Sequence, residues 1–414
     1  MKIALLSQSF PPMVSGAAGV VQGLAEQLAE RGNEVMVLTA SGRSTPYMVR
    51  EGNLILTRVC SCRNPLRVGQ RFAPLPHGEI MASLRTFHSD IIHTHDPLQF
   101  AHSGLLYGRR ASVPVVITVH QLPWFVKAYL PDWGAAGEIL EQGLWAYSRW
   151  MLYRCNAVVT PTRTIAGVIA AHTGIVPQVI GFGIDPEDFR PDPLEPGEAA
   201  GLRTKLGIPE RVPIVLHVGR LDRDKRVDIA IGAAARAMER SPAHLLVVGD
   251  GTEKVRLMRI CAEMGISERS HFTGFVTLEQ GLADLYRLAS VFVTASEIET
   301  QGLVLLEAAA CGLPLAAVTA TCIPEIVHQG LNGWLARPKD VDDLAACLQR
   351  LLSDPVQAQA MGQAGRLIVR GCVIQKTIDA HEVFYRQVIE RSQLVALSPR
   401  TAWPGRAKRS GVSD

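Results

Sequence analysis

The chain of 414 residues is 47% hydrophobic and 20% charged, and its formal net charge is +3. A near-neutral charge without a concentrated basic stripe is not the pattern of a nucleic-acid-binding protein. The length exceeds what one hydrophobic core usually serves, so we expect two domains. Eight scattered cysteines, none in a C-x-x-C pair, are typical of reduced thiols in a cytosolic protein, and we expect no zinc site.

The first half of the chain alternates short apolar runs with helix-length segments. The opening run, KIALLS at 2–7, is too short for a signal peptide and soon meets two prolines, so it predicts a buried strand. An amphipathic helix is expected at about 20–31. Further strand-like runs follow at 33–40, 90–95, 114–120 and 156–162. This alternation predicts βαβ units and a parallel sheet.

A proline-rich segment separates this half from the next. Residues 185–213 contain six prolines, which is typical of a linker. Strand-like runs then resume at 214–220, 244–251, 270–276, 290–296 and 313–319. The sequence therefore predicts an α/β protein of two Rossmann-like, doubly wound domains that face each other across a ligand-binding cleft.

The domain boundaries follow from these patterns. We expect a first domain at 1–190 and a second domain at 205–373. The last helix, about 374–395, follows the strands of the second domain and is expected to pack back on the first. The tail at 396–414 is expected to be disordered. The longest apolar window, 303–318, falls short of the roughly 20 residues that a membrane span needs.

The stretch SEIETQGLVLLEAAACGLP, at 296–314, places two of its three glutamates, Glu299 and Glu307, in a segment that is otherwise fit for a buried core. Glu299 follows a strand and is expected at the mouth of the cleft, where the unpaired amides of about 302–304 open a helix. Glu307 lies about one turn further in, where a carboxylate can accept hydrogen bonds from a diol. A nucleotide sugar, with hydroxyls at both ends and phosphates between, fits this layout. The alternative is a helix N-terminus whose acids favour its dipole.

Two cations follow the strand at 214–220. Arg220 and Lys225 lie in a loop that leads into a helix, where they can clamp a diphosphate. A solvated charged loop is the alternative. Asp222 and Asp224 form a D-x-D pattern, but they stand between two cations, so we expect them to face solvent and propose no metal site.

These segments together resemble the retaining glycosyltransferases of family 4, which have the GT-B fold. ETQGLVLLE resembles the E-x7-E motif of that family. GRLDRDKRVD resembles its G-R-L…K-G-x-D segment, with Arg226 where glycine is usual. FPPMVSGAAG resembles its N-terminal P-P…G-G loop, with Ser15 replacing the first glycine. HFTGFV, DIIHTHDP and VVITVH resemble further segments, so that the resemblance covers about residues 1–390.

The resemblance implies that the first domain binds the acceptor and the second domain binds the nucleotide sugar, and it implies roles for particular residues. Glu299 would hold the hydroxyls of the donor sugar and Glu307 the ribose, while Arg220 and Lys225 would neutralise the leaving diphosphate. His120 would lie beside the donor sugar; a buried structural histidine is the alternative. His93 and His95 alternate on a strand, so we expect only one of them to face the cleft and expect structural roles for both. The remaining donor-binding positions would be Gly16, Phe275, Val276, Thr300, Gly302 and Leu303.

The resemblance also implies the chemistry. Breaking a glycosyl–phosphate bond builds negative charge on the phosphate, which cations and helix amides stabilise. No pair of free carboxylates flanking a sugar is evident, so hydrolase chemistry is not supported. The resemblance implies retention of configuration by a hexosyltransferase that needs neither metal nor cofactor. UDP is the usual nucleotide of the family, so UDP-glucose or UDP-galactose is the expected donor.

The acceptor side is less specific. Residues 41–78 contain six arginines and only one acid, and aromatic residues follow at 121–133 and 144–154. This concentration suits an anionic membrane surface, although Trp145 and Trp150 fit a helix core equally well. Two positions near the acceptor or hinge depart from the family pattern. Phe182 stands where asparagine is common, and Val20 or Val21 stands where a histidine or polar residue is frequent.

SEIETQGLVLLEA resembles diacylglycerol glucosyltransferases and sulfolipid-synthase-like members of the family. We therefore expect a lipid or glycolipid acceptor and a cytosolic chain that can also sit on the inner face of the cell membrane. A soluble sugar acceptor is the first alternative. A sugar epimerase or phosphorylase of the same architecture is the second, because fold alone does not fix function. The oligomeric state is left open.

Overall fold

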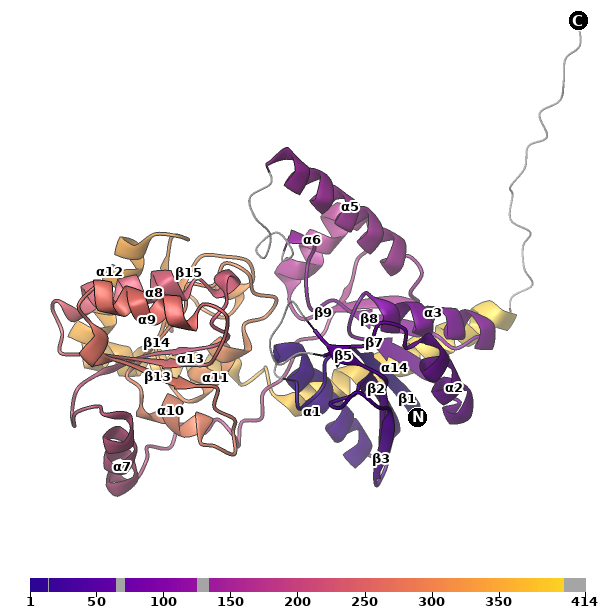
Figure 1. Ribbon diagram of the computed structural model, residues 1–414, viewed down its shortest axis with the longest axis horizontal. Coiled ribbons are helices and arrows are strands. Elements are labelled where there is room, and N and C mark those ends of the chain that lie inside the picture. Colours follow the sequence, from indigo (N-terminus) through magenta and orange to yellow (C-terminus); the bar gives the residue numbers. More distant parts are fainter. Residues whose placement is uncertain (14, 65–70, 125–133, 398–414) are drawn as a thin grey trace, which may run out of the picture.

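Two parallel sheets form two lobes of the molecule (Figure 1). This computed structural model describes residues 1–13, 15–64, 71–124 and 134–397. Within these residues, no helix is long and apolar enough to cross a membrane.

The first domain is built on an eight-stranded sheet with the order β10-β9-β8-β7-β1-β2-β4-β3. Its strands are parallel except for β3, which runs antiparallel to β4. The strands are β1 (Lys2–Ser7), β2 (Glu34–Ala40), β3 (Tyr47–Glu51), β4 (Leu54–Val59), β7 (Ile91–Thr94), β8 (Val115–Thr118), β9 (Ala157–Thr160) and β10 (Gln178–Val179). A small hairpin of β5 (Cys62–Arg63) and β6 (Arg71–Phe72) follows β4.

Helices cover both faces of this sheet, as the near-continuous apolar strands require. The helices are α1 (Gly16–Glu30), α2 (His77–Phe87), α3 (Gln99–Ala111), α5 (Ala135–Leu152), α6 (Arg163–Thr173) and α14 (Ile374–Leu397). Successive residues of β1 point to opposite faces. Leu5 packs in the core that includes α1 and α14, and Leu6 packs in the core that includes α2 and α3.

The last helix, α14, lies along the first domain although it follows the second in the chain (Figure 1). Ile378 and Tyr385 are fully buried in the same core as Val21 of α1. The Thr377 hydroxyl donates to the Gly181 carbonyl at 2.7 Å. The domain boundaries proposed from sequence stay a prediction, and the tail beyond Leu397 lies outside the described residues.

The second domain is built on a six-stranded parallel sheet with the order β13-β12-β11-β14-β15-β16. The strands are β11 (Ile214–Val218), β12 (His244–Val248), β13 (Ser270–Gly274), β14 (Val291–Val293), β15 (Leu315–Val318) and β16 (Gly333–Ala336). The helices are α7 (Pro196–Leu206), α8 (Val227–Met238), α9 (Lys254–Glu263), α10 (Leu282–Leu288), α11 (Leu303–Ala310), α12 (Val341–Ser353) and α13 (Pro355–Val369).

The proline-rich segment between the domains is not wholly extended. It contains α7, which begins at Pro196 and buries none of its residues. Proline is tolerated at the first position of a helix because its missing N–H would have no partner there. Composition alone therefore predicted a linker where the structure has a linker with a surface helix.

The carboxyl edges of the two sheets face each other. The Thr162 hydroxyl, just after β9, donates to the Thr300 carbonyl, after β14, at 2.9 Å. Glu325, after β15, accepts from the amides of Arg163 and Thr164 at the start of α6 at 3.2 and 2.7 Å. In both sheets the chain order reverses at the central strand, β1 or β11. Open α/β sheets bind ligands outside such reversal points.

Candidate functional site

Lys225 and Glu299 meet at the reversal point of the second sheet. Lys225 Nζ lies 2.6 Å from Glu299 Oε1, and the two side chains are 18% and 14% exposed. Lys225 follows β11 and Glu299 follows β14, so the pair spans the crevice between neighbouring strands. The Glu299 amide donates to the Thr321 hydroxyl at 3.2 Å, which fixes the loop. The structure thus brings together two residues that the sequence analysis assigned to one site.

Arg220 lies in the same loop but is engaged by acids. Its Nη2 donates to Asp224 Oδ2 at 2.9 Å, and Nη1 pairs with Asp222. Asp224 is buried and the Asp222 side chain is only 16% exposed. The expectation that both aspartates face solvent is therefore wrong, because pairing with the guanidinium compensates their burial. Within the described part of the chain, no group of three or more metal-type ligands occurs.

The contacts of Arg226 account for an arginine at a position where the family usually has glycine. It adopts a φ of 47°, in the left-handed region that favours glycine, and stands at the start of α8. Its guanidinium bonds Asp228 at 3.2 Å and Glu297 at 3.1 Å. These two ion pairs hold a conformation that glycine would adopt without strain.

Glu307 lies on α11 and is held by a tyrosine from α10. The Tyr286 hydroxyl donates to Glu307 Oε2 at 2.6 Å. Burial raises the pKa of Glu307 to about 7, although this hydrogen bond opposes the rise. One carboxylate oxygen is thus fixed by the protein, and Oε1 carries no hydrogen bond to any described residue.

The start of α11 supplies backbone donors beside Glu299. Gly302 has a φ of 79° and precedes Leu303, the first helical residue. A side chain at Gly302 would be strained by that φ and would approach the Leu305 side chain to 3.1 Å. Leu303 and Val304 open the helix, where amides lack a carbonyl one turn earlier. The Thr300 carbonyl is used in the bond with Thr162.

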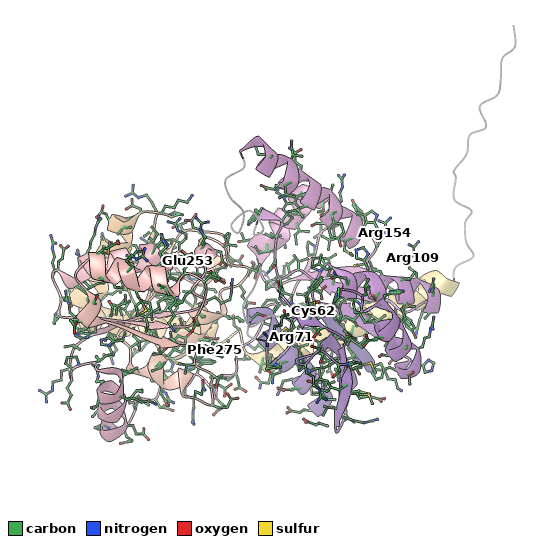
Figure 2. The ribbon with its side chains drawn as sticks, viewed as in Figure 1. Cys62, Arg71, Arg109, Arg154, Glu253 and Phe275 are labelled. Atoms are coloured by element: carbon green, nitrogen blue, oxygen red, sulfur yellow. The ribbon has the colours of Figure 1, made fainter. Side chains whose placement is uncertain are left out.

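Phe275 and Val276 follow β13 at the far edge of the same sheet. Phe275 is 49% exposed, and Val276 packs partly against the domain core. Figure 2 shows Phe275 on the half of the second domain that is nearer the first. These residues lie beyond β12 and β11 from Glu299, a spacing that leaves room for an extended ligand along the carboxyl edge.

Gly16 begins α1 at the carboxyl edge of the first sheet. A Cβ at this position would meet nothing within 4 Å, so packing within the chain does not require glycine here. Ser15, which replaces a glycine of the family motif, caps α1, since its hydroxyl accepts from the Ala18 amide at 3.1 Å. That hydrogen bond is the physical reason why serine is suitable.

His120 follows β8 and lies against two side chains. His95 Nδ1 lies 3.0 Å from His120 Nε2. The Phe182 ring stacks on His120 with 5.0 Å between ring centroids and 17° between planes. Burial lowers the pKa of His120 to about 4, so the imidazole is neutral at physiological pH. Phe182, another departure from the family pattern, thus packs against one face of the His120 ring.

The expectation that only one of His93 and His95 can face the cleft is wrong, because residues two apart on a strand point to the same face, and their ring centroids lie 4.1 Å apart. His93 is buried between Tyr385 of α14, at 2.6 Å, and Thr118 of β8, at 2.7 Å. His95 contacts His120, and its Nε2 is buried without a partner among the described residues. A purely structural role was expected for both, and the contact with His120 is what the sequence analysis missed in His95.

Gln301 and His217 were also missed. The Gln301 amide accepts from the Phe182 amide at 2.6 Å and donates to the Phe182 carbonyl at 2.8 Å, so it joins the two domains. His217 of β11 is buried, and its Nδ1 lies 3.0 Å from the Val293 carbonyl. The only sequence signal for Gln301 was its place between Glu299 and Gly302. His217 had none, because it sits inside an apolar strand.

The aromatic residues of the first domain differ in how far they are buried. Trp145 is buried and stacks on His172, with 4.0 Å between ring centroids, so it belongs to the core. Trp150 is 41% exposed and lies under the Arg154 guanidinium. Residues 125–133, which carry Phe125, Tyr129 and Trp133, lie outside the described residues.

Known proteins match both halves of the chain. Glycosyltransferase Family 4 matches residues 14–188, and Glycosyl transferases group 1 matches residues 200–368. The sulfoquinovosyl transferase SQD2 of Arabidopsis thaliana is 30% identical over 373 residues, which is 88% of this chain and 69% of that protein. A D-inositol 3-phosphate glycosyltransferase of Acidothermus cellulolyticus is 29% identical and covers 90% of this chain and 85% of its own.

Solved structures share the architecture. Sucrose-phosphate synthase from Thermosynechococcus elongatus superposes with a TM-score of 0.78 at 24% identity, covering 94% of this chain and all of its own. Anabaena Alr3699/HepE in complex with UDP-glucose superposes with a TM-score of 0.72 at 20% identity, covering 96% and 100%. At such identities the likeness establishes the fold alone.

Two doubly wound domains with opposed carboxyl edges define the GT-B fold of glycosyltransferases, as the sequence analysis predicted. The chain belongs to glycosyltransferase family 4, whose members transfer a sugar from a nucleotide-sugar donor. The resemblance stated from the motifs is thereby confirmed. The roles of the individual site residues stay predictions.

Proposed function

We propose that this protein transfers a hexose from UDP-glucose or UDP-galactose to a hydroxyl group of a lipid or glycolipid, with retention of configuration and without a metal ion. The main observation that supports this proposal is the Lys225–Glu299 pair beside the free amides of α11, with Glu307 one turn further along the helix. A cation, helix amides and two carboxylates at one crevice suit a diphosphate between two hydroxyl-bearing sugars.

In the proposed reaction, the bond between the anomeric carbon and the phosphate oxygen breaks, and its electron pair goes to the diphosphate. Lys225 and the amides of Gly302 and Leu303 stabilise that charge. Arg220 contributes less than Lys225, because Asp222 and Asp224 already balance its charge. The acceptor oxygen bonds to the anomeric carbon on the same face, and its proton passes to the leaving phosphate.

The other predicted residues fit around this centre. Glu299 binds hydroxyls of the transferred sugar and Glu307 those of the ribose. Neutral His120 lies across from them on the first domain, where it can hydrogen-bond the sugar without adding charge. The base lies against the backbone at Phe275 and Val276, and the absence of a side chain at Gly16 lets the first domain approach the donor.

The donor and acceptor rest on different support. Anabaena Alr3699/HepE has been solved with UDP and with UDP-glucose, which supports a UDP-sugar donor. The name of SQD2, a sulfoquinovosyl transferase, supports transfer of a sugar. The glycolipid acceptor and action at the inner face of the cell membrane rest on the resemblance of residues 296–308 to lipid-glycosylating members of the family. A soluble acceptor is the second candidate, favoured by a glycogen synthase of Mycobacterium tuberculosis at 28% identity.

The first experiment is thermal unfolding against UDP, GDP, ADP and their glucose, galactose and mannose conjugates, with and without EDTA. A ligand that binds the native state raises the unfolding midpoint. We expect a shift with UDP and one UDP-sugar that survives EDTA and disappears in Glu307→Ala and Lys225→Ala. No shift with any nucleotide would contradict the proposal.

Turnover then separates the alternatives. With a UDP-sugar, we expect UDP release that depends on diacylglycerol vesicles. Release of UDP without any acceptor would indicate an epimerase, and a requirement for inorganic phosphate would indicate a phosphorylase. A requirement for soluble sugar instead of vesicles would replace the lipid acceptor and leave the transferase reaction in place.

A further inference from the structure

Four arginines gather at the carboxyl edge of the first domain, on and after β2 and β4. The Arg43 guanidinium lies over the Tyr47 ring, 4.0 Å from its centroid, and that of Arg58 lies 5.8 Å from the same centroid. Arg63 and Arg71 lie directly opposite each other on the two strands of the β5–β6 hairpin. We call Arg43, Arg58, Arg63 and Arg71 the arginine cluster.

The cluster is not balanced by acids of the chain. Among the described residues, none of its members lies within 4.0 Å of a carboxylate oxygen. The nearby acid, Glu79, accepts instead from the Cys60 amide at 3.0 Å. Most other arginines around the proposed donor site, such as Arg220 and Arg226, are paired. The cluster is therefore a concentrated, uncompensated positive charge.

Arg58 is the buried member of the cluster, and no acid among the described residues pairs with it. Its side chain is buried, with residue exposure of only 4%, and its Nη1 donates to the Ala40 carbonyl at 3.1 Å. Nη2 donates to the Pro11 carbonyl, and Nε is buried without a partner among the described residues. Burying an unpaired cation is costly, and a nearby anion relieves that cost.

Arg71 presents a guanidinium already fixed in position. Its Nε donates to the Ser61 hydroxyl at 2.8 Å, and Nη2 donates to the Ser44 hydroxyl and the Ser61 carbonyl, both at 3.1 Å. Nη1 has no protein acceptor among the described residues. A planar guanidinium held this way loses little freedom when it binds an oxyanion.

The cluster borders the cleft. The Arg71 carbonyl accepts from Gln8 Nε2 at 2.9 Å, and its amide lies 3.3 Å from Met13 Sδ, so the hairpin rests on the loop that leads to Gly16. Figure 2 shows Arg71 and Cys62 on the side of the first domain nearer the second. The proposed diphosphate site lies on the second domain, at Lys225, and has no need of this charge.

We propose that the arginine cluster binds a phosphate-like anionic group of the acceptor, so that the protein glycosylates an anionic acceptor. The inference rests on the proposed function, because it assigns a substrate class to the acceptor side of that site. The anionic group can belong to a soluble phosphate ester or to the headgroup of an anionic lipid, and both present the same oxygens.

The test measures binding of two probe pairs to the wild type, Arg71→Gln and Arg63→Gln. One pair is glycerol 3-phosphate and glycerol, whose binding is measured by calorimetry. The other pair is phosphatidylcholine vesicles with and without phosphatidylglycerol, and cosedimentation measures binding to them. Arg50→Gln is the matched control, because Arg50 comes from the same basic segment but pairs with Glu34 away from the cluster.

We expect the wild type to bind the anionic member of one pair and not its neutral counterpart. Arg71→Gln should weaken that binding roughly tenfold or more, as loss of a charged hydrogen bond does. Arg63→Gln should weaken it too, and because Arg63 is exposed, that variant does not depend on the fold of the hairpin. The pair that responds identifies the source of the anion.

Two outcomes would overturn the inference. One is that the wild type binds neither anionic probe, and the other is that Arg50→Gln weakens binding as much as Arg71→Gln. The UDP-induced shift of the unfolding midpoint is measured on the same samples. A wild type without that shift contradicts the proposed function, whereas a normal shift without anion binding contradicts the arginine cluster alone.

Discussion

Lys225 Nζ contacts Glu299 Oε1 at 2.6 Å, and this ion pair ties the loop after β11 to the loop after β14. Each side chain is less than one-fifth exposed, so each needs the other while no donor is bound. A diphosphate that approaches Lys225 supplies a competing anion, which leaves Glu299 able to accept from sugar hydroxyls. The pair therefore stands in the structure as a preorganised part of the proposed donor site.

Replacing Lys225 tests this relationship. We expect Lys225→Ala to lower kcat by roughly 10²–10³-fold, because it removes a donor aimed at developing charge and leaves Glu299 unpaired. Steady-state kinetics with a UDP-sugar measures the effect. Lys2→Ala, which breaks an exposed pair with Glu34 at 3.2 Å, is the control and should leave kcat unchanged. Equal losses in both variants would show that no specific role exists.

Glu307 should make nucleotide binding depend on pH. Its pKa is raised to about 7, so the free protein carries a growing fraction of neutral Glu307 as the pH falls through 7. Ribose hydroxyls donate to the charged form, so affinity for UDP should rise with pH through this range and binding should release protons. Calorimetry in buffers of different ionisation enthalpy measures that release.

Two variants check the assignment to Glu307. Glu307→Gln should bind UDP more weakly and with no pH dependence near 7. Tyr286→Phe removes a hydrogen bond that lowers the pKa of Glu307, so the midpoint of the pH dependence should move upward. A midpoint that stays fixed in Tyr286→Phe would assign the titration to another group.

His95 should position His120. Its Nδ1 lies 3.0 Å from His120 Nε2, and loss of this bond would free the His120 ring. We expect His95→Leu to lower kcat roughly tenfold, the cost of about one hydrogen bond, with KM for the donor unchanged. His95→Asn places an amide near the Nδ1 position and should restore most of the rate. Similar rates for the Leu and Asn variants would leave His95 with a packing role only.

Gln301 should stabilise the junction of the two domains. Both polar atoms of its buried amide bond the backbone of Phe182. Gln301→Leu leaves the Phe182 amide and carbonyl without these partners, which should lower the free energy of unfolding by about 1–3 kcal/mol. Chemical denaturation measures the change. Gln363→Leu, at an exposed position of α13, is the control and should differ little from the wild type.

The sequence predicted where several residues of the proposed donor site lie, because Arg220, Lys225 and Glu299 each follow a strand. Parallel strands end at one edge, so Arg220, Lys225 and Glu299 could be placed together from the order of apolar runs alone. Glu307 followed from helical spacing. Asp222 and Asp224 could not be placed, because burial of an acid depends on whether a guanidinium reaches it, and spacing along a loop does not contain that distance.

The arginine cluster of the proposed acceptor side was less predictable for a related reason. The excess of arginine at 41–78 was visible, but whether a given arginine faces water or is buried without an acid depends on packing. Arg58 is held inside by the Ala40 and Pro11 carbonyls, which are 18 and 47 residues away in the chain. Trp145 and Trp150 likewise differ in burial although both belong to α5.

By itself the sequence determined the two doubly wound domains, the family and the strand ends that carry the residues of the proposed donor site, because these depend on local periodicity and motif spacing. Only the tertiary structure decided the contacts made between distant segments: His95 with His120, Gln301 with Phe182, Tyr286 with Glu307 and the arginine cluster with the Gly16 loop. Hydrogen bonds and charge compensation depend on distances of a few ångströms, which arise only when the whole chain packs.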